Sequence, residues 1–254
     1  MCKVISLCSH KGGVSKTTSS LNLATALGMM GKRVLVVDMD SQSNLTICAG
    51  VTTPDQLSHT TYTLLALALD EGELPPTSEY IIPRNYFDLI PCNINLSAFE
   101  VNRGHEIGAE RALQTILEPL KASYDFALID TAPSLGMLTI NAITASDSVL
   151  VPTTPQLLSA VGVKLLVTTI AKIQKHINPN VQIEGIFMTQ CDTRTNLYRE
   201  MSDVIEKTYG GTTRIFNAII PHSTKVGEAN LRCQSVLQYD EQSKPAQAYR
   251  YQSP

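Results

Sequence analysis

A glycine-rich segment near the start of the chain, residues 11–18, sets two lysines and two threonines in one tight loop. It follows an apolar run at residues 3–8 and precedes apolar residues at helical spacing from Leu21 to Leu27. Backbone N–H groups at a helix N-terminus point at bound phosphates, and glycines let the backbone approach them. Lys16 would reach the β- and γ-phosphates of a nucleotide, and the Thr17 hydroxyl would ligate Mg²⁺. These residues predict a phosphate-binding loop.

The loop departs from the ordinary pattern at its first position. His10 stands six residues before Lys16, where glycine is usual, and a second lysine, Lys11, opens the loop. In these features the segment resembles the deviant Walker A box of the ParA/MinD family of dimeric ATPases, whose pattern reads Lys-Gly-Gly-x-Gly-Lys-Thr-Thr. The resemblance implies that Lys11 and Lys16 are catalytic, with Lys11 reaching the nucleotide of a partner subunit. It also implies that ATP contacts the loop through Gly12, Gly13, Val14, Ser15, Lys16, Thr17 and Thr18.

Ser15 breaks the family pattern, because the family usually has glycine just before the catalytic lysine. If that position needs a positive φ, serine carries strain on the order of 1–3 kcal/mol, which proteins tolerate mainly at functional sites. The backbone N–H of Ser15 can still meet the β-phosphate. We interpret the change as tuning affinity or turnover, and a nucleotide-binding switch with little hydrolysis stays open as an alternative.

Three aspartates follow apolar, strand-like runs. Asp38 and Asp40 come at the end of residues 34–37, and Asp130 ends the run at residues 126–129. A rigid buried strand that delivers one carboxylate to the phosphate end suits a Mg²⁺ site. In the resembled family the counterparts of Asp38 and Asp130 lie near Mg²⁺, and that of Asp40 orients the attacking water. The resemblance therefore implies Thr17, Asp38 and Asp130 as metal residues and Asp40 as catalytic.

Later segments extend the resemblance over nearly the whole chain, among them residues 188–196 and 234–249. Carried over, the loops holding Asp192 and Pro221 border the adenine. Arg194, Arg199 and Lys225 correspond to places where ParA-like members carry basic residues for DNA. Cations held against phosphates give salt-dependent, sequence-independent affinity. Solvated surface charge is the other interpretation of these three residues.

Apolar runs alternate with helical patterns along the chain, which predicts an α/β fold with a mostly parallel twisted sheet flanked by helices. At 254 residues, 1–254 suits a single P-loop ATPase domain. Nucleotide should lie outside the carboxyl ends of the strands. We expect strands at residues 3–8, 34–37, 87–90, 126–129, 148–151 and 183–187, helices at 109–121 and 160–176, and an exposed connection at 70–86.

Composition narrows the class of protein. A net charge of −3 argues against a generally basic nucleic-acid binder, although residues 194–254 hold eight Lys/Arg against six Asp/Glu. No continuous apolar run approaches the ~20 residues of a membrane span. The six cysteines lie far apart without a Cys-x-x-Cys pair, which favours reduced thiols in a cytoplasmic protein over disulfides or zinc. The five histidines show no spacing typical of metal ligands.

The resemblance implies a partition-type ATPase. ATP and Mg²⁺ would drive a homodimer that binds DNA non-specifically on the nucleoid, and an adaptor protein would stimulate hydrolysis and release. The cargo would be a plasmid, a chromosome origin or a protein organelle such as a carboxysome. A membrane-cycling ATPase like MinD needs a C-terminal amphipathic helix with a basic face, and residues 243–254 lack a strong apolar stripe, so we expect no membrane partner. An iron–sulfur assembly relative would need a cysteine pair at a dimer face.

Overall fold

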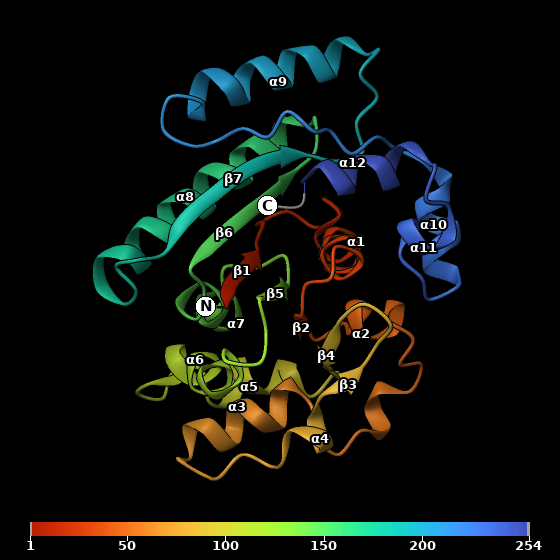
Figure 1. Ribbon diagram of the computed structural model, residues 1–254. Helices are drawn as coiled ribbons and strands as arrows, with labels where there is room; N and C mark the ends of the chain where they lie inside the picture. Colours follow the sequence, from red (N-terminus) through yellow and green to blue (C-terminus); the bar gives the residue numbers. More distant parts are fainter. Residues whose placement is uncertain (1, 253–254) are drawn as a thin grey trace.

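A seven-stranded sheet organises the molecule, as a computed structural model shows for residues 2–252 (Figure 1). The strand order is β3-β4-β2-β5-β1-β6-β7, and all neighbours are parallel except the edge pair β3 and β4. The strands are β1 (Lys3–Leu7), β2 (Val34–Met39), β3 (Ile82–Pro83), β4 (Asp88–Ile90), β5 (Phe126–Thr131), β6 (Ser148–Thr153) and β7 (Gln182–Met188). The predicted mostly parallel α/β fold is confirmed.

The helices form two layers, one on each face of the sheet. In chain order they are α1 (Lys16–Met29), α2 (Asn44–Cys48), α3 (Thr61–Leu69), α4 (Thr77–Tyr80), α5 (Leu96–Asn102), α6 (Ala112–Leu117), α7 (Met137–Thr144), α8 (Leu157–His176), α9 (Asn196–Tyr209), α10 (Thr224–Leu231), α11 (Val236–Tyr239) and α12 (Lys244–Gln252). Short 3₁₀ turns lie at η1 (Pro54–Gln56), η2 (Ala109–Arg111) and η3 (Glu118–Leu120). Helices α1, α2, α11 and α12 share one core with the sheet, and α3, α5, α6, α7 and α8 pack on its other face.

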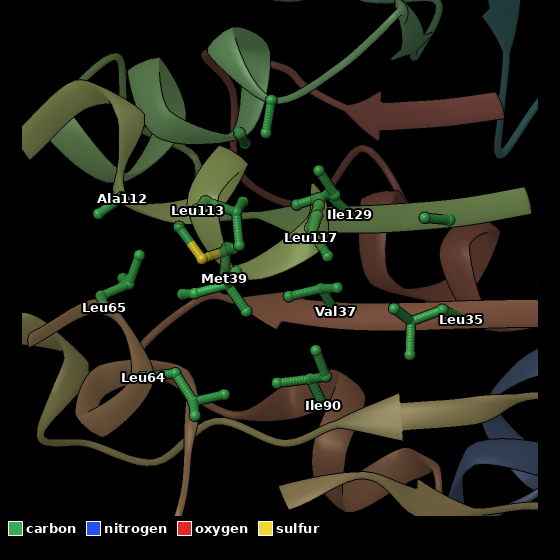
Figure 2. Packing of buried hydrophobic residues seen from close by; sticks show 14 of the residues in the cluster. Leu35, Val37, Met39, Leu64, Leu65, Ile90, Ala112, Leu113, Leu117 and Ile129 are labelled. Carbon is green, nitrogen blue, oxygen red and sulfur yellow. The ribbon is translucent and has the colours of Figure 1, made fainter. Parts of the chain in front are cut away.

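Alternation along the central strands assigns each side chain to a face. Val36 of β2 and Leu128 of β5 belong to the core under α1, whereas Val37 and Ile129 belong to the opposite core, where Figure 2 shows them packed beside Leu113. Because side chains two positions apart share a face, Asp38 and Asp130 project toward α1. Both faces of these strands are covered, which explains why they are continuous apolar runs in the sequence.

Two predicted helices differ in their bounds. The segment expected as one helix at residues 109–121 is divided into η2, α6 and η3. Pro119 lies in the final turn, where its ring and missing N–H interrupt the α-helical hydrogen bonds. Helix α8 begins at Leu157, three residues before its predicted start at residue 160.

The predicted connection at residues 70–86 also contains more structure than expected. It holds α4 and the edge strand β3, in which Pro83 pairs with Asp88 of β4. Proline is tolerated there because an edge strand leaves one side of its backbone unpaired.

Among the described residues, α8 is the one helix that is long and apolar enough, by length and composition, to cross a membrane. Its Val163, Leu166 and Ile170 are buried in one core with residues of β6 and β7.

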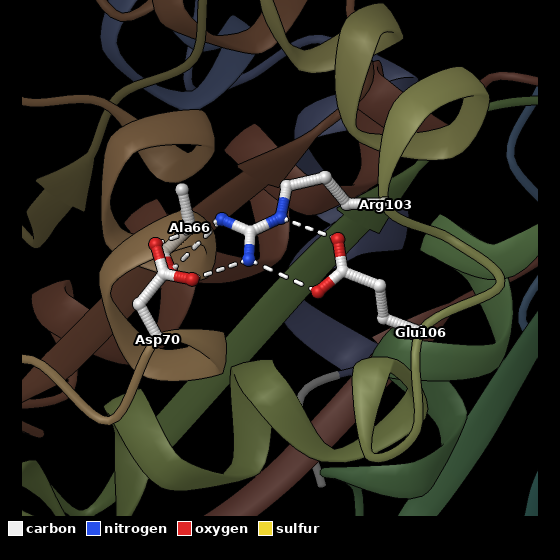
Figure 3. Close-up of polar contacts among 4 residues, drawn as sticks. All are labelled: Ala66, Asp70, Arg103 and Glu106. Atoms are coloured by element: carbon white, nitrogen blue, oxygen red, sulfur yellow. Dashed lines mark hydrogen bonds and ion pairs between the residues drawn. The ribbon is translucent and has the colours of Figure 1, made fainter.

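An arginine fixes the end of α5 against α3. The Arg103 guanidinium donates to both carboxylate oxygens of Asp70, at the end of α3 (Figure 3). Its Nε also donates to Oε1 of Glu106 at 2.8 Å. The guanidinium also lies 3.4 Å from the carbonyl oxygen of Ala66. These contacts brace the helical layer behind β2 and β5, whose carboxyl ends carry the aspartates.

Candidate functional site

The carboxyl ends of the three central strands bring the predicted residues together. In the sheet register Leu7 of β1 lies beside Asp130 of β5, and Asp130 lies beside Asp38 of β2. The chain leaves β1 through residues 8–15 and enters α1 at Lys16. The predicted loop and both aspartates therefore meet at one edge of the sheet, where open α/β folds bind ligands.

The N-terminus of α1 is open to an anion. Ser15 is its N-cap residue but makes no capping hydrogen bond through its side chain, and the first turn contains no acidic residue. The first N–H groups of a helix have no partner within it and carry the positive end of the helix dipole. Gly13 has φ 73°, a left-handed conformation that glycine adopts without strain. Together these features fit a phosphate group.

Lys16 is buried at the centre of this arrangement. It is 7% exposed, and its Nζ lies 3.4 Å from the carbonyl oxygen of Lys11. Burial lowers its pKa, and the negative charge of Asp130 acts in the opposite direction. The side chain of Lys11 instead donates to Oε1 of Gln156, just before α8. The two loop lysines thus point to different places, one inside the site and one toward the start of α8.

Asp130 is fully buried and only partly satisfied. Its Oδ1 accepts from the hydroxyl of Ser20 at 3.0 Å, whereas its Oδ2 has no hydrogen-bond partner in the described chain. Burial raises its pKa to about 7, the charge of Asp38 adds to this, and the nearby hydroxyls of Thr17 and Ser20 oppose it. A buried carboxylate oxygen without a partner, next to a threonine hydroxyl, offers the hard oxygen ligands that Mg²⁺ takes.

Asp38 has a different set of contacts. Its Oδ2 accepts from the backbone N–H of Thr46 at 2.9 Å and from the Thr46 hydroxyl at 2.6 Å. Its Oδ1 accepts from the backbone N–H of Asp40 at 3.1 Å. Burial raises the pKa of Asp38 to about 6 despite these bonds. Asp38 therefore holds the loop that carries Asp40, besides adding negative charge beside Asp130.

The described residues contain no group of three or more His, Cys, Asp or Glu side chains that could hold a metal by themselves. Mg²⁺ needs no such group, because it keeps several waters and is usually bound by one or two carboxylates and substrate phosphates. Thr17 and Asp130 fit this mode, with Asp38 adjacent.

Asp192 and Pro221 lie on two loops joined beside the phosphate loop. Cys191 and Pro221 form an isolated parallel bridge, and the Cys191 N–H donates to the carbonyl oxygen of Ile220 at 3.1 Å. Asp192 and Pro221 both line a cavity of about 990 Å³, and Pro221 also lines a second cavity of about 400 Å³ next to Ser15. These cavities have room for a base and a sugar next to the phosphate loop.

The three cations predicted to bind DNA differ in their partners. Arg194 donates twice to Asp192, from Nε at 2.9 Å and from a terminal nitrogen at 2.8 Å. Lys225 of α10 lies 3.2 Å from Glu228. Arg199 of α9 is exposed, and no ion pair to it occurs among residues 2–252. The sequence did not reveal that Arg194 is held by a residue of the predicted adenine loop.

Sequence reasoning missed several residues of the site. Ser20 lies one helical turn beyond the loop and bonds Asp130, and Thr46 holds Asp38. Helical spacing from the loop points to Ser20, since its position follows Lys16 by four residues. Gln156 and Gln190, which contact the loop from the segments after β6 and β7, carry no recognisable signal in the sequence.

Asp130→Asn is expected to stabilise the ligand-free protein in EDTA, increasingly as pH rises from 5 to 8. An aspartate has a pKa near 3.9 when unfolded. Because the pKa in the folded protein is about 7, the natural protein loses free energy of unfolding as pH rises through this window. Melting temperatures at several pH values check this. Asp125→Asn is the control, because Arg33 lowers the pKa of Asp125 to about 2 and its loss should only destabilise. If Asp130→Asn raised the melting temperature by the same amount at every pH, the prediction would be contradicted.

A glycine loop between a parallel strand and an open helix N-terminus, with a buried lysine and a strand-end carboxylate that has one oxygen without a partner, defines a nucleotide site of the P-loop class. Comparison with known proteins agrees: residues 2–183 match the family model described as "AAA domain". The sporulation initiation inhibitor protein Soj of Bacillus subtilis is 36% identical, over 98% of this chain and 96% of that protein. The chromosome partitioning protein ParA of Caulobacter vibrioides is 33% identical, over 97% and 91%.

Structural comparison gives the same class. The crystal structure of cobyrinic acid a,c-diamide synthase from Mycobacterium smegmatis, with bound ADP and magnesium, has a TM-score of 0.84 and 31% identity, covering 100% of this chain and 93% of that one. The chain belongs to the ParA/MinD family of P-loop ATPases, as the deviant Walker A loop predicted.

Proposed function

We propose that this protein is a partition-type ATPase that binds ATP and Mg²⁺ at the loop of residues 11–18. The observation that carries the proposal is the uncapped N-terminus of α1 beside buried Lys16 and the partnerless oxygen of Asp130. The name of the Caulobacter vibrioides relative, chromosome partitioning protein ParA, supports partition as the process. The cargo would be a plasmid, a chromosome origin or a protein organelle such as a carboxysome, and the protein would act in the cytoplasm on the nucleoid.

The residues present divide the work of hydrolysis. N–H groups of the loop and the ammonium of Lys16 hold the phosphates, and Thr17 and Asp130 hold Mg²⁺, which neutralises phosphate charge when bound. Asp40 orients a water that attacks the γ-phosphorus. The bond from that phosphorus to the bridging oxygen of ADP breaks, giving ADP and phosphate. Lys16 and, from a partner subunit, Lys11 stabilise the charge that develops.

An apolar surface beside Lys11 supports the homodimer. Leu157, Leu158 and Val161 of α8 are 68%, 71% and 51% exposed, and they follow Gln156, which holds the side chain of Lys11. Adjacent exposed apolar side chains at the edge of a ligand site are typical of an interaction surface. We propose that a second copy of this chain covers them when ATP is bound, which would carry Lys11 to the partner's nucleotide.

DNA binding rests on the cations beyond the adenine loops. Arg199 and Lys225 are the better candidates, because Arg194 is bound to Asp192 and its reversal would also disturb the adenine side. The C-terminal helix does not support a membrane-cycling role. Its Ala246 and Tyr249 are buried, and the Tyr249 hydroxyl lies 3.0 Å from that of Ser19 in α1.

The charge reversals Arg199→Glu and Lys225→Glu are expected to lower DNA affinity about tenfold each and to reduce the slope of log affinity against log salt by about one. Gel retardation on two unrelated duplexes, with ATP, ADP or no nucleotide at two salt concentrations, measures this and tests the proposed function. Lys172→Glu, at an exposed lysine of α8, is the matched control.

Retardation only with ATP and without sequence preference supports the proposal. Affinity that survives both reversals would place the DNA surface elsewhere. If ATP binds but no DNA is retarded under any condition, the protein is instead a switch docked on another partner, and an adaptor that stimulates phosphate release would then have to act without DNA.

A further inference from the structure

Gln190, which follows β7, makes two hydrogen bonds to the phosphate loop. Its Nε2 donates to the hydroxyl oxygen of Ser15 at 2.8 Å and to the carbonyl oxygen of Gly13 at 2.7 Å. The two segments are 175 residues apart in the chain, between Ser15 and Gln190. Gln190 also lines both the 400 Å³ and the 990 Å³ cavities, so it stands between the loop and the space for base and sugar.

The contact joins two strained residues. Ser15 has φ 63° and Gln190 has φ 54°, both in the left-handed region that is unfavourable for residues with a Cβ. Such conformations persist only where the surroundings fix them. At position 15, where glycine would adopt this φ freely, the hydrogen bond from Gln190 supplies that constraint.

The neighbouring residue adds a second tie. The Thr189 hydroxyl donates to the carbonyl oxygen of Val14 at 3.1 Å, and Thr189 is fully buried. Residues 189 and 190 therefore hold three consecutive loop residues, Gly13, Val14 and Ser15. Carbonyl oxygens engaged by these donors are turned away from a bound phosphate, which they would repel, while the N–H groups stay available.

We propose that Gln190 is a positioning residue for nucleotide binding: its amide holds Ser15 and Gly13 in the left-handed conformations that shape the phosphate loop. Through it the loop carrying Asp192 on the base side is coupled to the loop that holds the phosphates. The inference rests on the proposed ATP binding and deepens it. It implies that a loop with serine at position 15 binds ATP as well as a loop with glycine there, but only while Gln190 is present.

A double-mutant cycle of Gln190→Ala and Ser15→Gly tests this, with the dissociation constant of a non-hydrolysable ATP analogue and Mg²⁺ measured by calorimetry. With Ser15 in place, Gln190→Ala should weaken binding about tenfold, because it removes both hydrogen bonds to the loop and the constraint that they place on Ser15. In the Ser15→Gly background the same change should weaken it no more than about twofold, because glycine takes the positive φ unaided. Gln182→Ala, at the opposite end of β7, is the control and should change neither value.

A melting-temperature cycle without nucleotide accompanies it and makes the inference testable apart from ATP binding. Gln190→Ala should lower the melting temperature more with Ser15 than with glycine there. An equal effect in both backgrounds, in binding and in melting, would overturn the inference. Failure of the natural protein to bind the analogue would overturn the proposed function, while coupling in the melting temperatures would still support the Gln190–Ser15 constraint.

Discussion

Replacement of Lys16 by alanine is expected to weaken ATP binding about 100-fold and to remove measurable hydrolysis. Hydrogen bonds from a charged donor contribute about 1.5–3 kcal/mol each, and Lys16 is buried where it would meet the phosphates without competition from water. The same ammonium stabilises charge that grows in the transition state, so we expect the rate to fall more than the affinity. Titration with a fluorescent ATP analogue and a phosphate-release assay measure the two effects.

Lys11→Ala provides the contrast. Its ammonium contacts Gln156 and not the interior of the site, so a single subunit should retain ATP binding while hydrolysis by the dimer falls. Lys172→Ala, an exposed lysine of α8, should change neither quantity. ATP affinity that is unchanged by Lys16→Ala would show that the loop of residues 11–18 does not hold the phosphates.

The sheet was predictable because its central strands are buried on both faces. A parallel strand covered by helices on each side is apolar at nearly every position. Residues 34–37 and 126–129 can therefore be recognised as strands from their own sequence alone. The edge strand β3 did not, since two residues ending in Pro83 give no periodic pattern. The helix expected at residues 109–121 was wrong as a single element, because apolar spacing alone does not show where Pro119 interrupts it.

The site was predictable where one short segment carries the chemistry and not where distant segments meet. The loop contains its lysines, glycines and threonines in eight consecutive residues, so its sequence alone indicates phosphate binding. The bond from Gln190 to Ser15 depends on how the loop after β7 lies against the phosphate loop, whereas the bond from Arg194 to Asp192 forms within that one loop. A glutamine or an arginine in a loop has many possible partners, and only the fold selects one.

We propose that Asp40 acts on water and not on the metal, and its hydrogen bonds support this role. Its backbone N–H donates to Asp38, and its Oδ1 accepts from the backbone N–H of Gln42 at 3.0 Å, which fixes the direction of the carboxylate. Its Oδ2 makes no hydrogen bond to any other residue between 2 and 252. A carboxylate held in this way, with one oxygen available, can orient a nucleophilic water and accept its proton.

Asp40→Ala is therefore expected to bind ATP with nearly natural affinity and to hydrolyse it about 100-fold more slowly, since general-base groups contribute about 10²–10⁴ in rate. With turnover blocked, the ATP-bound dimer should accumulate, which size-exclusion chromatography with ATP and Mg²⁺ will show. Asp40→Asn separates chemistry from folding, because its oxygen can still accept from Gln42 while the negative charge is lost, and it should be equally slow.

The apolar surface of α8 supplies the control for that trapped dimer. Adding Leu158→Glu to Asp40→Ala should return the protein to monomers, because a charge placed among Leu157 and Val161 would be buried between the copies without a partner. ATP binding by each monomer should persist, since Leu158 lies outside the phosphate loop. Normal hydrolysis by Asp40→Ala would contradict the role of Asp40. A dimer that survives Leu158→Glu would place the dimer contact on another face. The surface beside Lys11 would then no longer explain how Lys11 reaches the partner's site.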